Sequence, residues 1–192
     1  MPPLRREAWD SAALHLYEDI YSLITVGRRQ HIDWHHDLLA IMTRTVEDPR
    51  GWSTLEWDID TDERNKENPA FPFLSHTVEK LTTKLHEIYP DSASELLVAM
   101  TFEGYEIANI PTFAERKPGL LTEARTLISR FEPDFTCYTN LSDSQPTKHL
   151  ESSRLVPHMN YGCMPLTEYT EDYGVVVVSD TEVGLFWFFN PI

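Results

Sequence analysis

The sequence predicts an α+β protein in which an N-terminal helical hairpin and further helices pack on a mainly antiparallel sheet that ends in a C-terminal β-hairpin. Near the N-terminus, apolar residues recur at spacings of three and four, the period of an amphipathic helix. The last part of the chain carries β-branched and aromatic runs separated by turn residues. Strand and helix patterns do not alternate regularly, which argues against a doubly wound parallel sheet. The 192 residues are predicted to form a single compact domain, residues 1–192.

The predicted helical hairpin comes from two amphipathic segments at the start of the chain. Residues 7–26 form the first predicted helix, and Gly27 is a natural residue for its C-terminal end. Its apolar face consists of Trp9, Ala13, Leu16, Ile20, Leu23 and Ile24. Residues 32–45 form the second helix, and the short link between the two predicts that they lie antiparallel.

The middle of the chain mixes strand and helix patterns. Residues 55–59 alternate apolar and acidic side chains, which predicts a half-buried strand with a charged outer face. A third helix is predicted at residues 76–89. Two strands are predicted at residues 95–102 and 105–110, joined by a tight turn at residues 103–104.

The C-terminal part contains the clearest strand patterns. A fourth helix is predicted at residues 120–131, and a short strand at residues 135–139. Residues 140–173 are predicted to form a long irregular loop, a kind of segment that is usually functional. Residues 174–179 and 184–189 predict a hairpin, and the unbroken valine run in its first strand indicates cover on both faces.

Negative charge is the most unusual property of the composition. The chain has 31 acidic and 16 basic residues, a formal net charge of −15, and residues 155–192 contain no lysine or arginine. Such a protein repels the phosphates of nucleic acids and anionic membranes, so neither is a predicted partner. It attracts a basic protein partner and speeds the encounter with it. The alternative is that the acidic surplus serves solubility alone.

Several features predict a cytoplasmic protein. No segment approaches the roughly 20 apolar residues of a membrane span, and no apolar run follows the N-terminal arginines as it would in a secretory signal. The two cysteines, Cys137 and Cys163, are interpreted as reduced thiols rather than as a disulfide framework.

The densest group of chemically versatile side chains lies at residues 31–37. His31, His35 and His36 occur there together with Asp33 and Asp37. In a helix, His31 and His35 would lie one turn apart on the same face, where two imidazoles can share a divalent metal. A metal-dependent hydrolase that uses His31, His35 and His36 as ligands is therefore one hypothesis. The alternative is a polar helix start whose histidines only cap and solvate the helix.

Other catalytic patterns are weak or missing in the sequence. Cys163 follows His158 by five residues, but nearness in sequence does not show an activated thiol. Gly-x-Ser-x-Gly does not occur, and neither does a phosphate-binding loop or a dinucleotide fingerprint. No cofactor other than a divalent metal is indicated, and a binding protein is favoured over an enzyme.

Two tryptophans flank the most acidic part of the chain. Interfaces favour tryptophan as an anchor inside a charged rim, so this segment is the predicted contact surface for a basic partner. That surface consists of Trp52, Glu56, Trp57, Asp58, Asp60, Asp62 and Glu63. The alternative is that both indoles belong to the core.

Taken together, these patterns favour a small acidic binding protein that masks a basic protein partner. Bacterial immunity proteins and other inhibitors of basic toxins share this general character, which is an analogy of composition and not of motifs. A scaffold subunit of a larger assembly is a further alternative that the sequence does not separate from an inhibitor.

Overall fold

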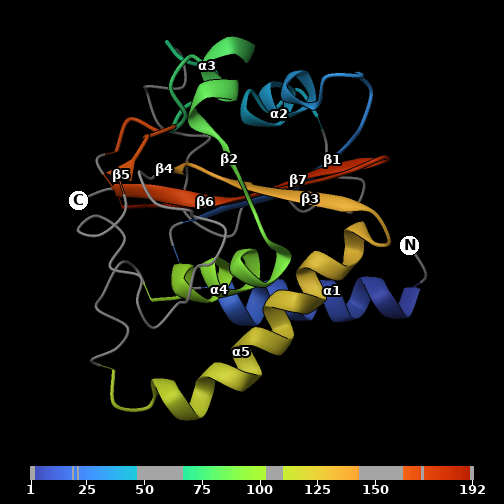
Figure 1. Ribbon diagram of the computed structural model, residues 1–192, viewed down its shortest axis with the longest axis vertical. Helices are drawn as coiled ribbons and strands as arrows, with labels where there is room; N and C mark the ends of the chain where they lie inside the picture. The colour runs from blue at the N-terminus through green and yellow to red at the C-terminus, as the bar shows by residue number, and fades with distance from the viewer. Residues whose placement is uncertain are drawn as a thin grey trace.

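A five-stranded antiparallel sheet forms the centre of the protein in a computed structural model (Figure 1). The model describes residues 3–18, 20, 22–46, 67–102, 110–142, 162–169 and 171–190. The strand order is β1-β7-β6-β3-β2, and each neighbouring pair is antiparallel. The strands are β1 (Ser22–Arg28), β2 (His86–Ile88), β3 (Phe135–Thr139), β6 (Glu171–Ser179) and β7 (Glu182–Asn190).

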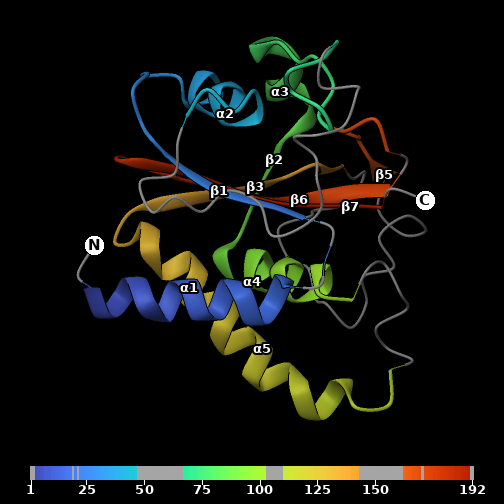
Figure 2. The same cartoon turned by 180° about the vertical axis from the view of Figure 1, so that it is seen from behind.

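Helices lie on both sides of this sheet, and the predicted α+β class is confirmed (Figures 1 and 2). One side is covered by α1 (Pro3–Tyr17), α4 (Pro90–Met100) and α5 (Phe113–Ile128). The other side carries α2 (Trp34–Met42) and α3 (Val78–Lys84). A short 3-10 helix at Ser129–Phe131 follows α5, and a small hairpin pairs β4 (Leu141–Ser142) with β5 (Gly162–Cys163). None of the helices in the described ranges has the length and apolar character that a membrane crossing requires.

The C-terminal hairpin is buried on both faces, as the valine run predicts. Val175 and Val177 belong to the core under α1, α4 and α5, whereas Val176 and Val178 belong to the core on the α2 side. The aromatic run of β7 divides in the same way, with Phe186 facing one layer and Trp187 the other. Because successive side chains of a strand point to opposite faces, a sheet between two helical layers needs such unbroken apolar runs.

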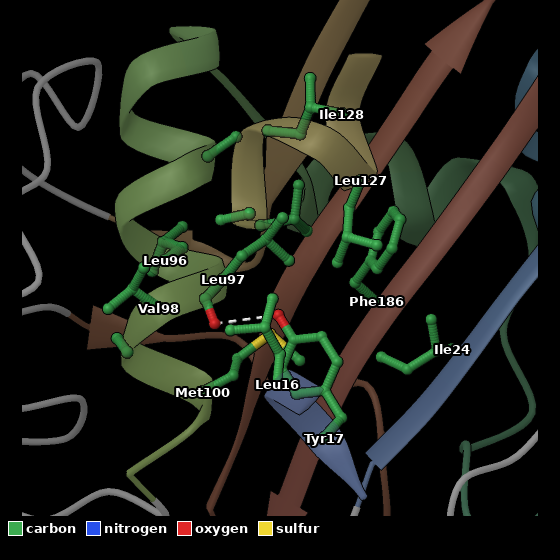
Figure 3. Close-up of a cluster of buried hydrophobic side chains, with 14 of the residues drawn as sticks. Leu16, Tyr17, Ile24, Leu96, Leu97, Val98, Met100, Leu127, Ile128 and Phe186 are labelled. Carbon is green, nitrogen blue, oxygen red and sulfur yellow. Dashed lines mark hydrogen bonds between the residues drawn. The ribbon is translucent and has the colours of Figure 1, made fainter. Parts of the chain in front are cut away.

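The core under α1, α4 and α5 is closed by hydrogen bonds as well as by apolar contacts (Figure 3). The Tyr17 hydroxyl donates to the Leu97 carbonyl oxygen over 2.9 Å, which fastens α1 to α4. The Trp9 indole N–H donates to the Leu127 carbonyl oxygen over 3.0 Å, which fastens α1 to α5. Both of these buried aromatic polar groups are therefore satisfied by backbone carbonyl oxygens.

The predicted N-terminal helical hairpin is wrong, because a strand lies between the two helices. The first helix ends at Tyr17, and Ser22–Arg28 forms β1, in which Leu23 lies opposite Trp187 of β7. Gly27 is therefore a strand residue and ends no helix. A Cβ at this position would lie 3.0 Å from the Ile41 side chain, so the glycine lets α2 approach the sheet closely.

Residues 90–102 also differ from the prediction. The segment predicted as a strand at residues 95–102 lies mostly in α4, which Pro90 begins. The helix predicted at residues 76–89 is shorter, since α3 ends at Lys84 and the chain continues into β2. The strand predicted at residues 55–59, and all but the last residue of the strand predicted at 105–110, lie outside the described residues.

The remaining elements agree more closely with prediction. β3 has the predicted bounds, and the C-terminal hairpin is confirmed with a first strand that begins at Glu171. The helix predicted at residues 120–131 exists but begins at Phe113, so that Pro118 lies inside it. The described parts of the predicted loop at residues 140–173 contain β4, β5 and the start of β6.

Candidate functional site

A cleft of about 510 Å³ opens on the α2 side of the sheet, where β3 begins and β6 ends. Its floor is made by Thr136 and Tyr138 of β3 together with Val178, the cross-strand neighbour of Thr136. These side chains face the cleft because β3 alternates, and Cys137 between them points into the opposite core. The full lining is Arg29, Trp34, Pro133, Asp134, Phe135, Thr136, Tyr138, Val178, Ser179 and Asp180.

Two aromatic residues of the cleft lining, Trp34 and Tyr138, form a row of rings with His35. The Trp34 ring stacks on His35 with centroids 3.8 Å apart, and it meets the Tyr138 ring at 4.6 Å. Asp33 caps α2 by accepting from the His35 backbone N–H at 3.1 Å, and its carboxylate also contacts His35 Nδ1 at 2.6 Å. These hydrogen bonds lower the pKa of Asp33, which holds the carboxylate charged beside the aromatic row.

The tyrosine in this row is held in its neutral form. Burial raises the pKa of Tyr138, and the carboxylate of Glu87, its partner across the β2–β3 pair, raises it further. The residue therefore offers a phenol rather than a phenolate to the cleft. It acts as a half-buried aromatic surface with one polar tip, a character that suits binding.

Two exposed carboxylates stand at the rim of the cleft. Asp134 precedes β3, and Asp180 lies in the turn after β6. Neither forms an ion pair with another residue in the described part of the chain. Their charge is therefore available to a ligand or partner that approaches the cleft.

Arg29 connects the cleft to the loop at residues 29–33, which we term the 29–33 loop. Its guanidinium donates to the carbonyl oxygen of Ser179 at 3.0 Å, at the end of β6. It also donates to the carbonyl oxygens of His31 at 3.1 Å and Ile32 at 2.8 Å. A planar guanidinium can bind several acceptors at once in fixed directions, so one side chain joins the sheet to the loop.

Asp37, a buried carboxylate on α2, holds the same loop from the other side. It accepts from the backbone N–H groups of Gln30 at 3.0 Å and His31 at 3.2 Å. It also contacts His31 Nδ1 at 2.7 Å and lies 3.5 Å from Arg29 Nε. A buried carboxylate needs such partners, because an unpaired charge in the interior is strongly unfavourable.

Two of the three histidines of the predicted metal site contact different carboxylates. His31 lies in the 29–33 loop rather than on α2 and contacts Asp37, whereas His35 contacts Asp33. The rings of His31 and His36 lie 5.4 Å apart. Within the described ranges, no group of three or more His, Cys, Asp or Glu side chains is arranged to hold a metal ion. A site completed by other parts of the chain stays a prediction.

The predicted contact surface at residues 52–63 lies outside the described residues, so the prediction for it stands as made. The structure instead brings forward Trp34, Tyr138, Asp134 and Asp180, which sequence reasoning missed. The signal that could have found them is the alternation of β3, which places Tyr138 opposite to the buried Cys137. Burial raises the pKa of the Cys137 thiol to about 12, as expected for a core thiol that is not a nucleophile.

A second buried carboxylate, Asp172, serves the fold. It accepts from the Leu166 backbone N–H at 2.8 Å, from Asn140 Nδ2 at 3.2 Å and from the Trp187 indole at 3.4 Å, and also from the Thr167 N–H. Burial raises its pKa, and no part of it is exposed. Since no ligand can reach it, this carboxylate ties residues 164–169 to the sheet.

Comparisons with family models, with curated proteins and with solved structures found no match for this chain.

Proposed function

We propose that this protein binds a basic protein partner and masks it, as an immunity protein or another toxin inhibitor does. The cleft and the 29–33 loop together form the proposed contact surface, which we term the binding face. The observation that carries the proposal is the half-buried aromatic pair Trp34 and Tyr138 beside two exposed carboxylates, Asp134 and Asp180, that form no ion pair with any described residue.

This combination suits protein recognition for two physical reasons. Half-buried aromatic side chains lose little conformational entropy on binding and bring a large contact area, so they dominate the energy of many interfaces. Carboxylates at the rim steer a basic partner toward those anchors and disfavour acidic competitors. The positive charge of Arg29 weakens this attraction little, because the Asp37 carboxylate lies 3.5 Å from Arg29 Nε.

The predicted segment at residues 52–63 belongs to the same proposal. It contains Trp52 and Trp57 and five carboxylates, which are the same residue types as those of the binding face. With a net charge of −15, the whole chain also supplies long-range attraction for a basic partner.

The proposal is tested by capture from the native host followed by kinetics on the purified pair. Wild-type protein should recover a basic protein that mass spectrometry identifies. The double substitution Asp134→Asn and Asp180→Asn should slow its association about tenfold at low salt, and the wild-type rate should fall steeply as salt rises.

A matched control removes the same charge elsewhere. Glu7→Gln with Glu115→Gln neutralises two exposed carboxylates on α1 and α5, on the other side of the sheet. Its association rate should stay within about twofold of wild type. A captured partner that is acidic, or an association rate that ignores salt, contradicts the proposal.

A metal-dependent hydrolase that uses His31, His35 and His36 is the alternative function. The contact between His31 Nδ1 and the buried Asp37 favours it, because carboxylates orient metal-binding imidazoles in this way. Protein purified without an affinity tag should then contain a stoichiometric divalent metal. Elemental analysis that finds no such metal removes this alternative.

A further inference from the structure

The 29–33 loop presents one apolar side chain entirely to solvent. Ile32 is 101% exposed, whereas the other large exposed apolar residues in the described ranges, such as Leu14 at 44%, are partly covered. Isoleucine is a large apolar side chain, and its transfer out of water is favourable. This side chain therefore has the most to gain from contact with a partner.

The backbone around Ile32 is held firmly by charged side chains. Arg29 donates to the carbonyl oxygens of His31 and Ile32, and Asp37 accepts from the N–H groups of Gln30 and His31. Hydrogen bonds with a charged partner are roughly twice as strong as neutral ones. The loop is thus ordered before any partner arrives, and binding does not have to order it again.

Single exposed apolar residues are common on protein surfaces and need no special explanation. A connection between β1 and α2 could also be ordered for stability alone. Two features distinguish this loop from both cases. The first is that hydrogen bonds hold the tip of the loop beside Ile32 as well as the ends of the loop. The second is that Arg29 both lines the cleft and donates to the Ile32 carbonyl oxygen. The exposed side chain and the cleft therefore share one rigid support.

We infer that Ile32 is the apolar anchor of the binding face and that it inserts into an apolar pocket on the basic partner. Asp33, Asp134 and Asp180 would face the lysine and arginine side chains that border this pocket. The inference rests on the proposed function and adds to it a division of roles. The carboxylates steer the encounter, and Ile32 holds the complex together after contact.

This division predicts different kinetic effects for the two kinds of residue. Steering acts at a distance, so neutralised carboxylates slow association and reduce its salt dependence. An inserted anchor acts only in the docked complex, so its truncation speeds dissociation and leaves association nearly unchanged. A side chain that is merely exposed changes neither rate.

The experiment uses the basic protein recovered by the wild-type chain, purified, and compares Ile32→Ala with Leu14→Ala. Leu14 is the matched control, since it is an exposed apolar residue on α1, on the other side of the sheet. The dissociation rate of Ile32→Ala should rise about 30-fold with its association rate within twofold of wild type. Leu14→Ala should leave both rates unchanged. Because Ile32 is fully exposed, its variant should melt within about 2 °C of wild type.

The possible failures are distinguishable. If wild type captures a basic protein and Ile32→Ala dissociates from it no faster, the anchor role is overturned while the proposed function stands. If wild type captures no basic protein, the proposed function is overturned and the anchor role with it. A faster dissociation in Leu14→Ala as well would show a general effect of apolar truncation and would also overturn the anchor role.

Discussion

The two faces of the sheet differ in the kind of buried polar side chain that makes their hydrogen bonds. On the face covered by α1, α4 and α5, neutral groups such as the Tyr17 hydroxyl and the Trp9 indole satisfy backbone carbonyl oxygens. On the α2 face, the two buried carboxylates of the described chain, Asp37 and Asp172, hold loops in place. A buried carboxylate is less favourable for stability than an apolar contact, so the presence of both carboxylates on one face indicates that the exact position of its loops matters.

The largest effect is expected for Asp37→Asn, which breaks the charged network of the α2 face. The amide keeps one acceptor oxygen but leaves the Arg29 guanidinium without its ion-pair partner. We expect the free energy of unfolding to fall by about 2–3 kcal/mol, as measured by urea denaturation. The amide protons of Gln30 and His31 should also exchange faster with solvent. Unchanged exchange at both positions would show that Asp37 does not order the loop.

A smaller effect, with a characteristic pH dependence, is expected for Asp172→Asn. The amide oxygen can still accept from the backbone N–H groups that bind Oδ2, but its NH2 group would then face the Asn140 Nδ2 donor at the Oδ1 position. Two donors that face each other in the interior should lower the free energy of unfolding by about 2 kcal/mol. The folded-state pKa of Asp172 is raised above its unfolded value, so the folded protein binds the proton more tightly. Wild-type stability from this group is therefore largest below the unfolded pKa and declines as pH rises through the window up to the folded pKa.

The measurement is the difference in unfolding free energy between wild type and Asp172→Asn as a function of pH. The difference should shrink as pH rises through the window that begins near the unfolded value of 3.8, and it should be constant above the folded pKa. A difference that is independent of pH would mean that this carboxylate titrates alike in the folded and unfolded states.

The smallest effects are expected on the face covered by α1, α4 and α5, where two buried tyrosines form a matched pair. Tyr17→Phe removes the hydrogen bond to Leu97 and should lower the free energy of unfolding by about 1 kcal/mol. The Tyr173 hydroxyl is buried with no hydrogen-bond partner among the described residues, so Tyr173→Phe should be neutral or slightly stabilising. Thermal unfolding of the two variants measures both effects. An equal loss of unfolding free energy in the two variants would contradict the view that only the Tyr17 hydroxyl makes a stabilising hydrogen bond.

The local sequence pattern was sufficient to predict a helix or strand wherever neighbouring residues in the sequence determine it. The valine run and turn of the C-terminal hairpin, the alternation of β3 and the body of α5 follow from short stretches of the chain. The strand β1 and the helix α4 do not, because both are buried on nearly all sides and polar residues are among the buried ones. A segment buried all round shows neither the helical nor the strand period clearly. Contact with β7, more than 150 residues further along the chain, decides that Ser22–Arg28 is extended.

Prediction from local sequence pattern has the same limit at the candidate site. The sequence alone determined the acidic surplus and the group of histidines and aspartates at residues 31–37, because composition and spacing are local properties. Only the tertiary structure decided that Asp37 and Arg29 hold a loop that exposes Ile32, and that Tyr138 and Asp180 lie beside it. The physical reason is that the roles of charged and aromatic side chains depend on partners from distant strands, which come together only when the sheet forms.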